Sequence, residues 1–158
     1  MERIILTTGG TGGHIFPALA LAEALKERFP AVRILFVGGE KGPEQTMAGK
    51  AGLEFKGLPA SGVLGRGFRS ASAIFWLGRS LLKSLWLLRR FRPQAVIGFG
   101  GYAGFAPVMA AVWLRIPSSS AGARNEEALR TAAEWAQRRV LAAGGTCELV
   151  DAPSGPLV

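Results

Sequence analysis

The segment GGTGGH, residues 9–14, places four glycines around one threonine and ends on the only histidine of the chain. It follows the β-rich run RIILTT at 3–8 and leads into an apolar stretch that predicts a helix to about Arg28, with Pro17 suited to its first turn. Glycine permits a sharp turn, and the helix directs free N–H groups and its positive dipole end at that turn. Such a strand–turn–helix unit can hold an anion or the polar groups of a sugar.

Strand-like and helix-like segments alternate beyond this unit. Further strands are predicted at 33–39, 53–58 and 94–99, and further helices at 42–52, 71–91 and 105–114. Continuous apolar strands between helices predict an α/β fold, a Rossmann-like parallel sheet with helices on both faces. Ligands bind such sheets beyond the carboxyl ends of the strands, where both GGTGGH and the second glycine turn, GGYAG, fall.

The chain becomes harder to interpret after these elements. A fifth buried strand is due at IPSSSAGARN, residues 116–125, but three serines cannot supply its apolar faces. Residues 125–145 predict a helix that Asn125 can cap and Gly144 can end.

Composition fits one domain of 158 residues with an ample core, since 49% of the residues are hydrophobic. Lys and Arg number 19 against 11 Asp and Glu, and the net charge of +8 favours an anionic partner. The lone Cys147 excludes an internal disulfide and fits a reducing compartment. Because residues 3–8 resemble a strand and not the apolar region of a signal peptide, a cytosolic location is expected.

The uncharged span 93–114 is long enough to cross a bilayer. Its centre, FGGYAGFAP, is so rich in glycine that backbone groups would be left unsatisfied in lipid. A buried strand, a glycine turn and a buried helix explain the same residues better.

The first turn matches neither of two common phosphate-binding motifs. A dinucleotide fingerprint would need a third glycine where Ile15 stands. A Walker loop needs Gly-Lys followed by a hydroxyl residue, but Gly-Lys occurs only at Gly49-Lys50, where Ala51 follows. His14 can act as a general base on a substrate hydroxyl, or it can hydrogen-bond the loop and hold its shape. With one His and no carboxylate pair at ligand spacing, neither a metal nor another cofactor is expected.

Two segments together carry a resemblance to a known family: GGTGGHIFPALALAEAL at 9–25 and VIGFGGYAGFAPVMAA at 96–111. In order and spacing, residues 1–117 resemble the MurG family of peptidoglycan glycosyltransferases, glycosyltransferase family 28. The resemblance implies the N-terminal, acceptor-binding half of a GT-B fold, in which two Rossmann-like domains flank a cleft.

The resemblance also implies a reaction: inverting transfer of N-acetylglucosamine from UDP-N-acetylglucosamine to the C4 hydroxyl of lipid I, which forms lipid II. His14 would activate that hydroxyl. The other residues implied in substrate binding, to the donor or to the lipid diphosphate, are Gly10, Thr11, Gly12, Gly13, Gly100, Gly101 and Tyr102. Tyr102 can hydrogen-bond a sugar or simply pack on its turn.

The helix predicted at 71–91 carries Phe75, Trp76, Leu82 and Trp86 away from its core stripe, interspersed with basic residues. Such a helix can lie in a membrane interface, or it can be a core helix with a solvated basic edge. Since the family works at the inner face of the membrane, we expect peripheral binding to the cytoplasmic face of the cell membrane.

The resemblance breaks after Ile116-Pro117, where the family continues with a His-Glu-Gln-Asn motif that this sequence lacks. We therefore expect an acceptor-binding domain at 1–117, a divergent helical tail at 118–158 and no donor-binding domain, a truncated form that is inactive alone. The alternative is a non-catalytic, membrane-associated subunit of a split glycosyltransferase. A nucleic-acid-binding domain ranks last, because no recognised nucleic-acid-binding signature accompanies the charge.

Overall fold

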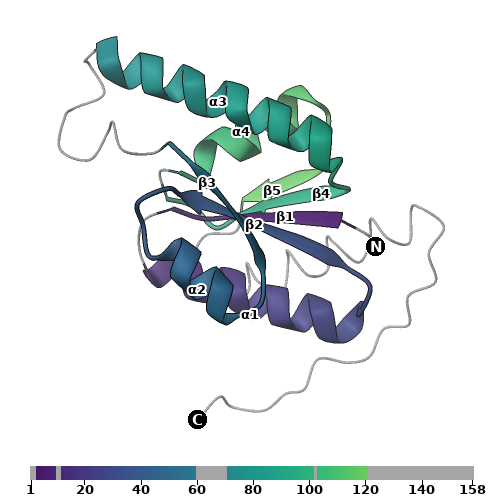
Figure 1. The fold of residues 1–158 in the computed structure, drawn as a ribbon. Helices are drawn as coiled ribbons and strands as arrows, with labels where there is room; N and C mark the ends of the chain where they lie inside the picture. Colours follow the sequence, from purple (N-terminus) through teal and green to yellow (C-terminus); the bar gives the residue numbers. More distant parts are fainter. Residues whose placement is uncertain (1–2, 10–11, 60–70, 102, 121–158) are drawn as a thin grey trace.

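The computed structural model describes residues 3–9, 12–59, 71–101 and 103–120, and these form one α/β unit (Figure 1). The elements in chain order are β1 (Arg3–Thr7), α1 (Gly12–Arg28), β2 (Arg33–Gly39), α2 (Glu44–Lys50), β3 (Glu54–Leu58), α3 (Ala71–Phe91), β4 (Ala95–Gly98), α4 (Phe105–Trp113) and β5 (Ser118–Ser120).

All the described strands are parallel and form one sheet in the order β3-β2-β1-β4-β5. Helices α1 and α2 cover one face of this sheet, and α3 and α4 cover the other (Figure 1). The predicted Rossmann-like arrangement is therefore confirmed.

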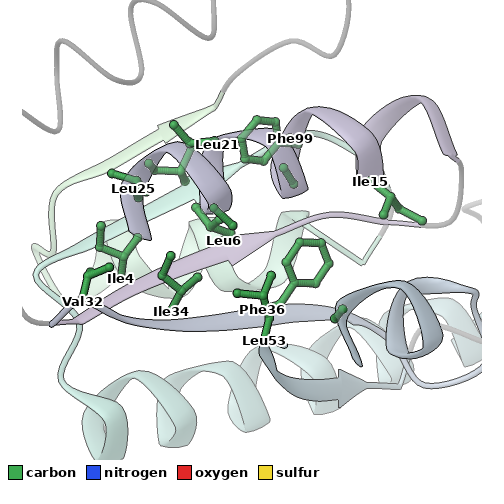
Figure 2. Close-up of a cluster of buried hydrophobic side chains, with 14 residues drawn as sticks. Ile4, Leu6, Ile15, Leu21, Leu25, Val32, Ile34, Phe36, Leu53 and Phe99 are labelled. Carbon is green, nitrogen blue, oxygen red and sulfur yellow. The ribbon is translucent and has the colours of Figure 1, made fainter. Parts of the chain in front are cut away.

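The core beneath α1 and α2 follows from the alternation of the strands and the period of the helix (Figure 2). Ile4 and Leu6 of β1 lie on this face beside Ile34 and Phe36 of β2, because residues two apart in a strand share a face. Apolar residues of α1 recur at spacings of three and four and close the cluster: Ile15, Ala18, Leu21, Ala22 and Leu25.

The second core lies beneath α3 and α4. Ile5, Leu35 and Val37 pack there against Leu87 and Leu88 of α3. Leu81 and Leu85 of α3 are half-buried against this cluster. Leu82 and Trp86 were expected to lie away from the core, and both are exposed. Ile74, Phe75 and Trp76 also belong to α3, but their side chains lie outside the described part.

Two local expectations were wrong. The serines of β5 do form a strand, with Ser118 and Ser119 paired to Val96 and Ile97 of β4. Because β5 ends the described sheet and Ser118 and Ser119 are only half-buried, main-chain pairing suffices without two apolar faces. In addition, α1 begins at Gly12, so Pro17 lies inside the helix and not in its first turn.

The span 93–114 forms β4, a glycine turn and α4, as expected. No helix in the described part of the chain is long and apolar enough to cross a bilayer. The helix predicted at 125–145 lies outside the described residues, and the proposed division at 117 stays a prediction.

Candidate functional site

The two glycine turns leave the sheet side by side. The chain places β2 on one side of β1 and β4 on the other, so the strand order reverses between β1 and β4. Thr7 is paired in register with Gly98, and the amide of Phe99 donates to the carbonyl of Thr7 at 2.8 Å. The expectation that both turns lie at one sheet edge is confirmed, and that edge is the switch point at which open α/β sheets bind ligands.

Direct packing of Gly101 on Gly9 joins the two turns. Gly100 and Gly101 have positive φ angles of 82° and 77°, which side chains rarely adopt. A Cβ added at Gly101 would overlap the carbonyl oxygen of Gly9 and lie 2.7 Å from its Cα. Glycine is therefore required at position 101 both by conformation and by the close approach of the first turn.

His14 lies in the first turn of α1 and contacts the second glycine turn. A Cβ added at Gly100 would lie 3.4 Å from Cε1 of His14 and 3.5 Å from its Nδ1, so the half-buried imidazole packs on this glycine. Its Nδ1 is buried and has no hydrogen-bond partner among the described residues. The contact agrees with a loop-holding role, and the unpartnered nitrogen leaves proton transfer open.

Two helices begin at this edge from opposite faces of the sheet. Neither α1 nor α4 has an acidic residue in its first turn, and Gly104 at the start of α4 offers no side-chain cap. The first amides of a helix lack intrahelical partners, and its dipole places about half a positive charge there. The paired turns and helix ends thus form a concentration of main-chain donors suited to an anion.

Gly13 differs from the glycines of the second turn. It is exposed, and an added Cβ would meet nothing within 4 Å among the described neighbours. The packing of the described residues therefore does not require glycine at this position. A glycine here presents no side chain to a ligand that approaches the first amides of α1.

The structure brings five of the predicted site residues to this edge: Gly12, Gly13, His14, Gly100 and Gly101. The first two belong to the first turn of α1, not to the loop before it. Gly10, Thr11 and Tyr102 lie outside the described residues, and their roles stay predictions.

Sequence reasoning missed two hydroxyl groups beneath the turns. Thr7 and Thr8 are fully buried, and neither hydroxyl has a partner within the described ranges. A strand covered on both faces is expected to be apolar throughout. The two threonines that end RIILTT depart from this pattern and could have indicated polar groups at the site. These hydroxyls are further polar groups at the carboxyl end of β1.

Sequence reasoning also missed an apolar rim. Phe16 in α1 and Phe105 in α4 are 64% and 54% exposed, one beside each glycine turn.

Within the described ranges, no group of three His, Cys, Asp or Glu side chains is placed to hold a metal ion.

The strand order and the glycine turns meeting at its switch point define a Rossmann-like α/β domain of the GT-B class. Residues 4–123 match the glycosyltransferase family 28 N-terminal domain, and the chain belongs to this family.

Similar proteins agree with this membership. A protein of Nitratidesulfovibrio vulgaris (strain Miyazaki F) is 56% identical over 111 residues, which are 70% of this chain and 29% of that protein. One of Solidesulfovibrio magneticus is 53% identical over 119 residues, 75% of this chain and 32% of the relative. Both are named UDP-N-acetylglucosamine–N-acetylmuramyl-(pentapeptide) pyrophosphoryl-undecaprenol N-acetylglucosamine transferase.

The crystal structure of Acinetobacter baumannii MurG is similar with a TM-score of 0.65 and 27% identity, over 76% of this chain and 34% of that one. The chain thus spans about a third of the length of the relatives it matches.

Proposed function

We propose that this chain is the acceptor-binding part of an inverting glycosyltransferase that transfers N-acetylglucosamine from UDP-N-acetylglucosamine to the C4 hydroxyl of lipid I. The observation that carries the proposal is the contact between the two glycine turns, with His14 packed on Gly100 at the switch point. Family membership and the names of the relatives support the same reaction.

In this mechanism a ring nitrogen of His14 takes the proton of the C4 hydroxyl as its oxygen attacks the anomeric carbon of the donor sugar. The bond from that carbon to the diphosphate breaks, the electron pair leaves with UDP, and the configuration inverts to give a β-linkage. Main-chain amides at the two turns and helix ends stabilise the negative charges of the diphosphates, since fixed donors need little reorganisation during the reaction.

By resemblance to the family, a second domain supplies most donor contacts. A polypeptide of residues 1–158 produced without such a domain is therefore expected to bind acceptor without turnover. The alternative assignment, a non-catalytic, membrane-associated acceptor-binding subunit of a split glycosyltransferase, rests on the same turns and differs in that a separate chain binds the donor.

Peripheral binding to the cytoplasmic face of the cell membrane is part of the proposal. Leu82 and Trp86 of α3 are 69% and 59% exposed, Trp113 of the adjoining α4 is 62% exposed, and the basic residue Arg79 of α3 is exposed as well. Apolar and basic residues together suit an anionic lipid surface. Sedimentation with phosphatidylglycerol vesicles is expected to fall in Leu82→Glu. It is expected to stay unchanged in the matched variant Ala20→Glu, because Ala20 is exposed on α1, which covers the opposite face of the sheet. Equal sedimentation of both variants would refute the membrane assignment.

A chimera tests the catalytic proposal. In this chimera, the aligned segment of this chain replaces the matching segment of the Nitratidesulfovibrio vulgaris relative. The assay measures transfer of labelled N-acetylglucosamine to lipid I. Transfer is expected, with kcat reduced about 100-fold or more by His14→Ala, in the range for loss of a general base. A chimera that folds and binds UDP-N-acetylglucosamine but transfers no sugar would refute the catalytic assignment.

A further inference from the structure

A cavity lies at the opposite edge of the sheet from the glycine turns, where the strands begin and α3 ends. It has a volume of about 500 Å³. Its walls come from the first residues of β1, β2 and β3 and from the last turns of α3. The glycosyl-transfer site proposed above does not use this cavity.

The alternation of the strands places charged residues in this cavity. Arg3 and Arg33 are paired in register, two residues before Ile5 and Leu35, which are buried beneath α3. Lys56 of β3 is paired with Val37, another residue of the same core. Since side chains two apart share a face, these three basic residues lie on the side of the sheet that α3 covers.

The charge balance of the cavity is positive. Arg90 of α3 joins Arg3, Arg33 and Lys56 in its lining, against one carboxylate, Glu54. Glu54 binds Arg33 at 3.2 Å, but both side chains are more than half exposed, so this pair is weak and can exchange for another anion. The carboxyl end of α3 contributes only about half a negative charge. More than two positive charges therefore remain.

Two arginines of the cavity lie against aromatic rings. Arg33 lies over the ring of Phe91 and Arg90 over the ring of Trp86, each with its central carbon 5.7 Å from the ring centroid. A guanidinium held against a ring keeps N–H groups for a second partner. Arg3 lines the same cavity, and its Nε is buried without a hydrogen-bond partner among the described residues.

We propose that this cavity binds a phosphate-bearing anion, a phosphomonoester or a diphosphate. Its oxygens would accept from the guanidinium groups of Arg3 and Arg90, since the arginine fork matches phosphate in geometry and charge. The phosphate belongs either to a soluble ester or to a phospholipid headgroup, which present the same chemistry. The site accounts for part of the +8 charge and does not depend on the function assigned to the glycine turns.

Titration of the full chain with inorganic pyrophosphate, followed by calorimetry and by ¹H–¹⁵N NMR, tests the proposal. Saturable binding is expected to shift the Trp86 indole N–H and the amides of Arg3 and Arg33. Arg90→Gln is expected to weaken binding ~10-fold or more, as loss of a charged hydrogen-bond donor does. Arg89→Gln is the matched control, because Arg89 is exposed in the same turn of α3 and does not line the cavity.

Arg3→Gln is a second variant, checked for retained thermal unfolding, and is expected to weaken binding similarly. Phosphatidylglycerol and phosphatidylcholine vesicles separate the two sources. Competition between pyrophosphate and phosphatidylglycerol, sensitive to Arg90→Gln, identifies a headgroup, and insensitivity to vesicles identifies a soluble ester. Shifts confined to Gly100 and Gly101, equal weakening by Arg89→Gln, or unchanged binding in Arg3→Gln and Arg90→Gln would overturn the proposal.

Discussion

Replacement of Gly101 by alanine is expected to destabilise the fold through the contact between the two turns. A non-glycine residue at a φ of 77° costs about 1–2 kcal/mol. The new Cβ also overlaps the carbonyl oxygen of Gly9, and main-chain atoms on both sides leave no flexible side chain to move aside. Overpacking of this kind costs about 1–3 kcal/mol, so the free energy of unfolding is expected to fall by roughly 2–5 kcal/mol.

Urea denaturation monitored by circular dichroism measures this change, with the slope checked for two-state behaviour. Gly49→Ala is the matched control: Gly49 is exposed within α2, and its added Cβ meets nothing within 4 Å in the described part of the chain. The control is expected to gain about 0.5–1 kcal/mol, because alanine is the better helix former. If Gly101→Ala unfolds at the midpoint of the unsubstituted chain, the two turns do not pack as described.

Three further substitutions test the packing and the helix ends. Leu88→Ala, at a side chain that is 1% exposed beneath α3, is expected to lower the free energy of unfolding by about 2–5 kcal/mol in urea denaturation. Arg115 follows the end of α4 at a φ of 54°, in the position that Gly52 holds after α2. Arg115→Gly is therefore expected to raise the thermal midpoint and to increase the free energy of unfolding by about 0.5–1 kcal/mol. Lys83→Met removes an exposed ion pair to Glu40 at 3.1 Å and is expected to cost no more than about 1 kcal/mol, with a loss that shrinks at 1 M NaCl.

The sequence predicted the local elements well because their signals are local. Glycine turns and apolar runs mark the strand ends, and the predicted bounds of α3, 71–91, agree with the structure. β5 was judged wrongly because the requirement for apolar residues depends on whether a strand has neighbours on both sides. The position of a strand in the sheet depends on the strand order, and three serines in the sequence do not reveal that order.

The candidate site was predictable in its residues and its edge but not in its contacts. Strand order decides that Gly9 meets Gly101, and His14 reaches Gly100 only because β1 and β4 are neighbours. The basic cavity was harder to foresee, because Arg3 and Arg90 lie far apart in the chain and each resembles an ordinary surface charge on its own.

The central claim is that main-chain amides beside Gly13 bind the diphosphate of a lipid-linked acceptor, and Gly13→Ala tests it most directly. The added methyl group meets nothing within 4 Å among the residues that the structure describes, so the fold is expected to be retained. Calorimetry with a short-chain, water-soluble lipid I analogue should show binding weakened ~10-fold or more, because the methyl group obstructs the open amides. Binding by Gly13→Ala equal to that of the unsubstituted chain and of Gly49→Ala would contradict the account.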